Sequence, residues 1–329
     1  MRGIIDALIR PHAHVAADNV DDALAASADG IRAVKLSLAG LGLTAALQIG
    51  VVFVTGSVAL LADTVHNFGD AITAVPLWIA FALGARTASR RYTFGYGRAE
   101  DLAGVFVVLM IAASAVLAGY ESVVRLLDPR PIDNLGWVAA AGLVGFLGNE
   151  VVAQYRIKVG ERIGSAALVA DGYHARTDGL TSIAVLLGAG GVWLGFRQAD
   201  PLFGLAITVA ILFVLKGAGT QMWHRLMDGI EPEVVLAAES AAQDVSGVVG
   251  VTLIRPRWIG HTIHAEARVT VDQDLSVIEG HRIAEEVEHA MTHAVPKLTT
   301  VIVHIDPCGH DGADIHTAAD GHVSAIHVH

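Results

Sequence analysis

The feature that most constrains this chain is the clustering of its apolar residues into long blocks before about residue 225. A block of about 20 apolar residues is the length that a helix needs to cross a hydrocarbon core about 30 Å thick. Over the whole chain 53% of the residues are apolar and only 17% are charged, whereas about 25% of the residues of a soluble domain are charged. The sequence therefore predicts a membrane protein with a smaller soluble part after the blocks.

The apolar blocks predict six membrane-spanning helices. Glycine, proline and basic residues mark the breaks between the blocks. The predicted spans are residues 32–54, 57–83, 99–125, 134–156, 164–191 and 200–222, within a membrane domain of residues 32–225. Residues 1–31 precede them, and the stretch Asp18, Asp21 and Asp22 interrupts the apolar core that a cleaved signal peptide would need.

Basic residues predict the orientation of the spans, because cytoplasmic loops carry an excess of lysine and arginine. The predicted loops 86–98 and 156–162 hold most of these residues, whereas the opposite loops hold little more than Arg130 and Arg197. We therefore expect an integral protein of the plasma (inner) membrane, surrounded by lipid, with both termini in the cytoplasm.

From residue 226 the pattern changes to that of a soluble domain, predicted to end at residue 308. In residues 262–271 polar and apolar side chains alternate, as they do in a strand with one buried face. Helices are predicted at 232–245 and 275–294, and strands at 248–255, 262–271 and 299–305. This order is typical of a small cytoplasmic α+β domain of ferredoxin-like type. The histidine-rich tail, residues 309–329, is expected to be flexible.

Charge and cysteine content exclude two classes of function. The net charge of −11 argues against a nucleic-acid partner, because binding to phosphates depends on basic residues. The single cysteine, Cys308, excludes a disulfide framework within the chain.

One polar pattern occurs in both the second and the fifth predicted spans. Asp63, His66 and Asp70 have the same spacing as Asp171, His174 and Asp178, and both copies fit A-D-x-x-H-x-x-x-D. Ionisable side chains inside a span are costly unless they have partners or face a wet cavity. Three spans separate the two copies, so they run antiparallel, as in inverted repeats with a binding site at mid-membrane.

The spacing predicts a metal site. A histidine and an aspartate four residues apart lie on one helix face, so the two copies together present two imidazoles and two carboxylates, the ligands of a tetrahedral zinc-like ion. A structural hydrogen bond inside the bundle is the alternative for a single copy. Asp63 and Asp171 are candidates to orient the imidazoles, to stabilise helix packing or to carry protons. Arg176 needs a counter-ion, for which Asp63, Asp171 and Glu150 are the candidates.

The chain resembles the cation diffusion facilitator family, the proton-coupled zinc transporters. The resemblance covers about residue 30 to 308. It includes the segment from Gly56 to Asp63 that leads into His66 and Asp70, the sequence Tyr96-Gly97-Arg98-Ala99-Glu100, the His174 and Asp178 pair, and Val303-His304-Ile305-Asp306-Pro307. The two H-x-x-x-D motifs are the specific part of this match.

The resemblance implies a homodimer whose cytoplasmic domains meet and which exports zinc from the cytoplasm against protons. It also implies an ion pair near the dimer interface between Arg98 and Asp228. Some relatives bind metal in the loop between spans two and three, but Ser89, Tyr92 and Tyr96 stand at those places here, so we expect no site in this loop.

The resemblance also implies a candidate metal site in the cytoplasmic domain. His281, His304 and Asp306 match positions at which relatives bind zinc, whereas Thr252 and Arg268 occupy two others. His264 faces the same way as Arg268 along its predicted strand and could substitute for a missing ligand.

The ligand types suggest the mechanism and the cargo. Metal binds deprotonated imidazole and carboxylate, so protons compete with it, and alternating access would make the exchange an antiport. Nitrogen donors favour zinc, with cadmium or cobalt as alternatives, over magnesium or calcium. The alternative function is a proton-coupled carrier of another solute, with the His and Asp pairs as a proton relay. No H-E-x-x-H motif occurs, so we do not expect an enzyme.

Overall fold

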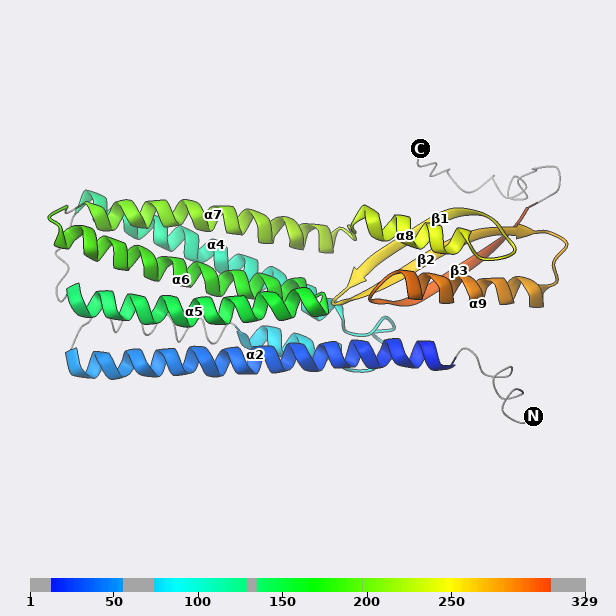
Figure 1. Cartoon of the computed structure of the whole chain (residues 1–329), viewed down its shortest axis with the longest axis horizontal. Coiled ribbons are helices and arrows are strands. Elements are labelled where there is room, and N and C mark those ends of the chain that lie inside the picture. The colour runs from blue at the N-terminus through cyan, green and yellow to red at the C-terminus, as the bar shows by residue number, and fades with distance from the viewer. Residues whose placement is uncertain (1–12, 56–73, 129–134, 197, 309–329) are drawn as a thin grey trace. The chain divides into compact units, whose positions relative to one another are not determined.

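The computed structural model describes residues 13–55, 74–128, 135–196 and 198–308 (Figure 1). The chain divides into two compact units. The larger unit runs from Leu24 to Met227, and the smaller one combines the residues up to Ala23 with those from Asp228 onward.

Long helices build the larger unit. They are α2 (Ala13–Thr55), which begins in the smaller unit, α4 (Arg98–Leu127), α5 (Leu135–Ile163), α6 (Ala166–Trp193) and α7 (Ala199–Leu226), and residues 74–84 are also helical. Helix α6 packs against α4, α5 and α7, and Figure 1 shows it between α5 and α7. Its buried residues lie on all sides of the helix, so α6 is the central helix of the described part of this unit.

Close approach of α5 and α6 depends on small residues. A Cβ atom added to Gly172 of α6 would lie 2.6 Å from Ile157 Cγ1 and 3.0 Å from the Ile157 backbone nitrogen. Such distances are too short for a real side chain, so the absence of a Cβ at this position lets the two helix backbones come together.

Three of the described helical segments are long and apolar enough to cross a membrane: residues 23–47, α4 and α7. Helices α5 and α6 have 29 and 28 residues, which at 1.5 Å per residue is also sufficient length. Both carry charged residues along their length, which lowers their mean hydropathy. The second predicted span lies mostly outside the described residues, so the prediction of six spans stays a prediction.

The first predicted span, residues 32–54, lies within α2, which begins earlier, at Ala13. One predicted boundary is wrong. The predicted loop 156–162 is helical and belongs to α5. Basic side chains do not break a helix, and α5 ends only before Gly164, whose φ of 81° is a left-handed conformation that glycine adopts without strain.

The smaller unit contains a three-stranded sheet with two helices on one face. Its elements are α8 (Pro232–Gln243), β1 (Val248–Ile259), β2 (Thr262–Asp272), α9 (Val277–Ala294) and β3 (Leu298–Cys308). The strand order is β1-β2-β3, with β1 antiparallel and β3 parallel to the central β2. The predicted order of helices and strands is confirmed, whereas the assignment to a ferredoxin-like type stays a prediction.

The core of this unit explains the alternation in its sequence. Every second residue of β2 from Ile263 to Val271 is buried, and these side chains pack with α8 and α9 in one apolar cluster. The residues between them, including His264, Glu266 and Arg268, lie on the opposite face of the sheet.

Candidate metal centre

The start of α6 is defined by its local sequence. Gly164 makes the left-handed turn after α5, and the Ser165 side chain accepts a hydrogen bond from the Leu168 backbone N–H, which caps the new helix. The tight turn folds α6 back along α5 and brings its first three turns into the buried centre of the unit.

His174 and Asp178 lie together on one face of α6, as their spacing predicts. His174 Nδ1 is 3.8 Å from Asp178 Oδ2, and the two side chains are only 2% and 4% exposed. Two ligands of one tetrahedral ion, each about 2.0–2.2 Å from it, lie about 3.3–3.6 Å apart. A slight inward movement would therefore let both side chains bind the same ion.

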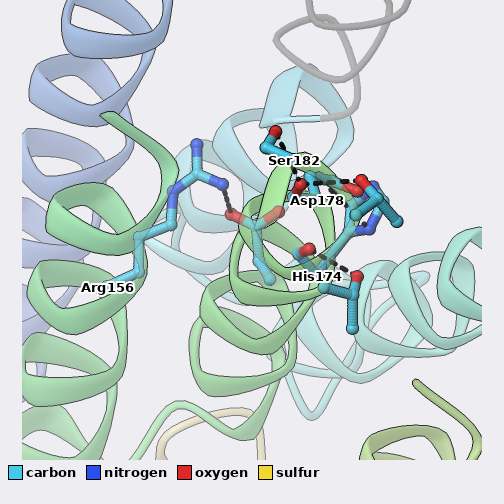
Figure 2. Close-up of polar contacts among 7 residues, drawn as sticks. Arg156, His174, Asp178 and Ser182 are labelled. Carbon is cyan, nitrogen blue, oxygen red and sulfur yellow. Dashed lines mark hydrogen bonds and ion pairs between the residues drawn. The ribbon is translucent and has the colours of Figure 1, made fainter. Parts of the chain in front are cut away.

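Hydroxyl groups around the pair hydrogen-bond to the helix itself. Thr177 Oγ1 donates to the His174 carbonyl at 2.6 Å, and Ser182 Oγ donates to the Asp178 carbonyl at 3.2 Å. Figure 2 shows His174, Asp178 and Ser182 close together on α6. These hydrogen bonds satisfy the hydroxyl donors next to the pair within α6 itself.

The other half of the predicted site cannot be placed in the same way. Asp63, His66 and Asp70 lie outside the described residues. The meeting of the two motifs therefore stays a prediction, and the structure supplies the His174 and Asp178 half.

A buried ion pair next to this half was not predicted. Arg156 Nη1 of α5 lies 2.9 Å from Asp171 Oδ2 of α6, and the side chains are 2% and 0% exposed (Figure 2). Among the described residues, Arg156 Nε and Nη2 have no hydrogen-bond acceptor. Asp171 thus has a guanidinium partner, one turn before His174, and its predicted role of orienting an imidazole stays a prediction.

The sequence does contain a signal for this pair. In an antiparallel helix hairpin, residues at similar distances from the turn lie opposite each other. Arg156 stands eight residues before Gly164 and Asp171 stands seven residues after it. The interpretation of Arg156 as a loop residue concealed this relation, because it placed the turn too early.

Of the two candidate counter-ions of Arg176 that the structure describes, Glu150 is its partner. Arg176 Nη2 donates to Glu150 Oε1 at 3.1 Å and Arg176 Nε donates to Glu150 Oε2 at 3.2 Å. Asp171 is engaged by Arg156, and Asp63 lies outside the described residues. Helices α5 and α6 are therefore joined by two ion pairs of opposite polarity.

Arg98 opens α4 with two described contacts. It lies 3.4 Å from Asp101 on its own helix and donates to the Arg225 carbonyl at 3.3 Å. Asp228 belongs to the other compact unit, so its predicted pairing with Arg98 stays a prediction.

The candidate residues of the small sheet domain are only partly brought together. His304 Nε2 lies 3.0 Å from Asp306 Oδ1, and Arg268 Nε lies 3.5 Å from the other oxygen of that carboxylate. His264 lies on the same sheet face as His304, whereas His281 is on α9 and pairs with Glu285 at 3.4 Å. No group of three or more histidine, cysteine or acidic residues is close enough to hold a metal ion within the described segments.

Comparison with known proteins identifies the family. Residues 34–217 match the family model of the cation efflux transmembrane domain, and residues 230–308 match the cytoplasmic domain of cation efflux proteins. The chain belongs to the cation diffusion facilitator family. The predicted resemblance is confirmed, and this cation efflux protein is an integral membrane protein with a cytoplasmic C-terminal domain.

Similar sequences agree with this placement. A probable cation efflux system protein of Mycobacterium tuberculosis is 60% identical over 307 residues, which cover 93% of this chain and 92% of that protein. The cation-efflux pump FieF of Serratia proteamaculans is 30% identical, with coverages of 77% and 85%. The magnetosome protein MamB of a Magnetospira strain is 28% identical, with coverages of 77% and 87%. The family consists of cation efflux transporters, not enzymes.

Proposed function

We propose that this cation efflux protein exports a zinc-like divalent cation from the cytoplasm in exchange for protons. The cation would bind between the second and fifth of six spans, held by His66, Asp70, His174 and Asp178. The protein would act as a homodimer in the inner membrane, with both termini in the cytoplasm.

The buried His174 and Asp178 pair carries this proposal. An imidazole nitrogen and a carboxylate oxygen 3.8 Å apart, each almost completely buried in the central helix, suit ligation better than solvation. The matching spacing of His66 and Asp70 supplies the second pair. Two nitrogen and two oxygen ligands favour zinc, cobalt or cadmium over cations that prefer oxygen-rich octahedral sites.

Proton exchange follows from the same ligands. Both imidazoles must be deprotonated to bind the ion, and histidine titrates near neutral pH. Low pH on the outer side would therefore promote release, and higher pH in the cytoplasm would promote loading. The nearby Asp171 is paired with Arg156 at 2.9 Å, so we assign the exchange to the four metal ligands.

Zinc flux into inside-out proteoliposomes tests the proposal. A fluorescent zinc indicator inside the vesicles would report uptake with and without an imposed pH gradient. We expect gradient-dependent uptake by the unaltered chain and loss of uptake in Asp70→Ala and Asp178→Ala. The matched control is His289→Ala on the solvated side of α9, which should transport normally. Zinc uptake that ignores the gradient would exclude antiport, and normal uptake by both aspartate variants would exclude the site.

Selectivity gives a second test of the ligand set. His66→Asp exchanges a nitrogen donor for an oxygen donor, and it should increase manganese or cadmium uptake relative to zinc. Unchanged relative rates would show that the ligand type does not discriminate between metals here.

A further inference from the structure

The loop between helix 74–84 and α4 carries positive charge that no described carboxylate neutralises. This segment, residues 85–97, is called the arginine loop below. It contains Arg86, Arg90 and Arg91 and no acidic residue, in a chain whose net charge is −11. All three arginines are exposed, and among the described residues no carboxylate forms an ion pair with any of them. Arg98, which follows the loop, differs because Asp101 is its partner.

The arginine loop has a defined shape. Ser89 and Tyr92 are joined by two hydrogen bonds, from the Tyr92 N–H to Ser89 Oγ and from the Ser89 N–H to the Tyr92 carbonyl, both 3.1 Å long. Gly95, with φ of 77°, donates its N–H to the same carbonyl at 3.0 Å. The rings of Tyr92 and Tyr96 then lie 4.9 Å apart. These contacts hold the arginines on a compact turn.

Two exposed aromatic side chains accompany the arginines. Phe94 is 67% exposed and Tyr92 is 49% exposed, and the Arg91 guanidinium lies 5.9 Å from the centre of the Tyr92 ring. Aromatic rings concentrate at the boundary between hydrocarbon and headgroups, and arginine side chains extend from there into the headgroup layer.

The position of the arginine loop between two apolar helices keeps it at the membrane surface. It is only 13 residues long and joins the apolar helix 74–84 to α4, which is apolar enough to span a membrane. Neither end can leave the membrane surface by more than a few residues. Exposed side chains of the loop are therefore within reach of the headgroup layer, which contains the phosphates of anionic lipids.

We propose that the arginine loop binds the phosphate headgroups of anionic phospholipids, with Arg86, Arg90 and Arg91 as the phosphate ligands and Phe94 in the interface. Guanidinium groups suit this role because they donate two parallel hydrogen bonds to a phosphate. Near an anionic surface, each arginine strengthens binding by about fivefold, so three together contribute about 100-fold. The inference does not depend on the identity of the transported metal.

Native mass spectrometry of the full chain in neutral detergent tests this proposal. Phosphatidylglycerol and phosphatidylcholine would be titrated separately, and the lipid-bound fraction would be compared between the unaltered chain and Arg86→Gln/Arg90→Gln/Arg91→Gln. We expect a preference for phosphatidylglycerol that the triple variant reduces by about 100-fold. The corresponding triple arginine-to-lysine variant keeps the charge and should retain most of the preference. Arg255→Gln/Arg257→Gln, in the cytoplasmic domain, is the matched control and should bind lipid normally.

Other occupants give distinct results in the same experiment. Equal phosphatidylglycerol binding by the unaltered chain and the triple glutamine variant would overturn the proposal. Displacement of the lipid by inorganic phosphate at the same concentration would overturn it in favour of a free-phosphate site. A gain in binding after removal of residues 309–329 would overturn it in favour of the aspartates of the histidine-rich tail as the normal occupant of the loop. Phe94→Ala should weaken binding of both lipids equally, because the ring does not contact the phosphate.

Discussion

The same spacing of histidine and acid occurs in two helices of this protein and has opposite surroundings in each. On α6, His174 and Asp178 are four residues apart, 3.8 Å from each other, and 2% and 4% exposed. On α9, His281 and Glu285 are also four residues apart, at 3.4 Å, but 72% and 35% exposed. The His281 and Glu285 pair thus has the shorter distance, although it is the more exposed of the two pairs.

The two helices differ in what covers them. Helix α6 is packed by α4, α5 and α7, so its ionisable groups have lost water and must find other partners. Helix α9 is amphipathic and covers one face of a sheet, with its acids and histidines toward solvent. Local spacing therefore brings two side chains together, whereas burial determines whether their interaction has a large energetic effect.

The largest expected effect is on the buried ion pair of α5 and α6. Arg156→Leu leaves the Asp171 carboxylate buried without its cation, and we expect the free energy of unfolding to fall by about 3–5 kcal/mol. Arg156→Leu/Asp171→Leu should recover most of this loss, because no buried charge remains. Arg176→Leu, at the more exposed pair with Glu150, should cost about 1 kcal/mol. Denaturation of the detergent-solubilised protein measures all three variants.

Equal losses in Arg156→Leu and in the double variant would contradict this account of the pair. They would show that the arginine stabilises by packing its stem and not by neutralising Asp171.

The next largest effect is on stabilisation by metal. Zinc at 100 times its dissociation constant should stabilise the folded chain by about 2.7 kcal/mol. His174→Ala should remove most of this stabilisation, whereas His281→Ala should leave the part due to the membrane site. Thermal unfolding with and without zinc measures the difference. If His281→Ala had the larger effect, the principal metal site would lie in the cytoplasmic domain, and the comparison of the two pairs would be reversed.

A smaller effect is expected for the cap at the N-terminus of α9. Ser276 caps this helix, and its side chain and backbone N–H both bond to Glu279. These hydrogen bonds, that of the side chain first, lower the pKa of Glu279 below its ordinary value of 4.5. Ser276→Ala should cost about 1 kcal/mol at pH 7.

The pH dependence of this capping contact has a definite sign. A lowered pKa means that the Glu279 carboxylate stabilises the fold above pH 4.5, and this contribution is lost as the pH falls through the lower, folded value. The difference between the unaltered chain and Ser276→Ala should therefore shrink under acid. A constant difference down to pH 3 would show that Glu279 does not contribute through its charge.

The smallest effect is expected for the exposed pair itself. Glu285→Gln removes the acid next to His281 and should change stability by about 0.3–0.5 kcal/mol at most. Transport should be unchanged, which proteoliposome flux would check. If Glu285→Gln lowered the free energy of unfolding as much as Arg156→Leu, burial would not explain the difference between the pairs of α6 and of α9.

The sequence by itself determined the membrane character, the order of elements in the cytoplasmic domain and the pairing of His174 with Asp178 on one helix face. All of these follow from local periodicity, because 20-residue blocks, alternation and a spacing of four are properties of short segments. The family resemblance also came from such local motifs.

Only the tertiary structure decided where the charged side chains found their partners. Arg156 was interpreted as a loop residue and is buried against Asp171, and among the described candidates Arg176 pairs with Glu150 and not with Asp171. The physical reason is that burial and long-range ion pairs depend on which helices pack together and where the turn between them lies. The sequence pattern alone shows neither the packing of the helices nor the position of the turn. Only the recognition of Gly164 as the turn between α5 and α6 places Arg156 opposite Asp171.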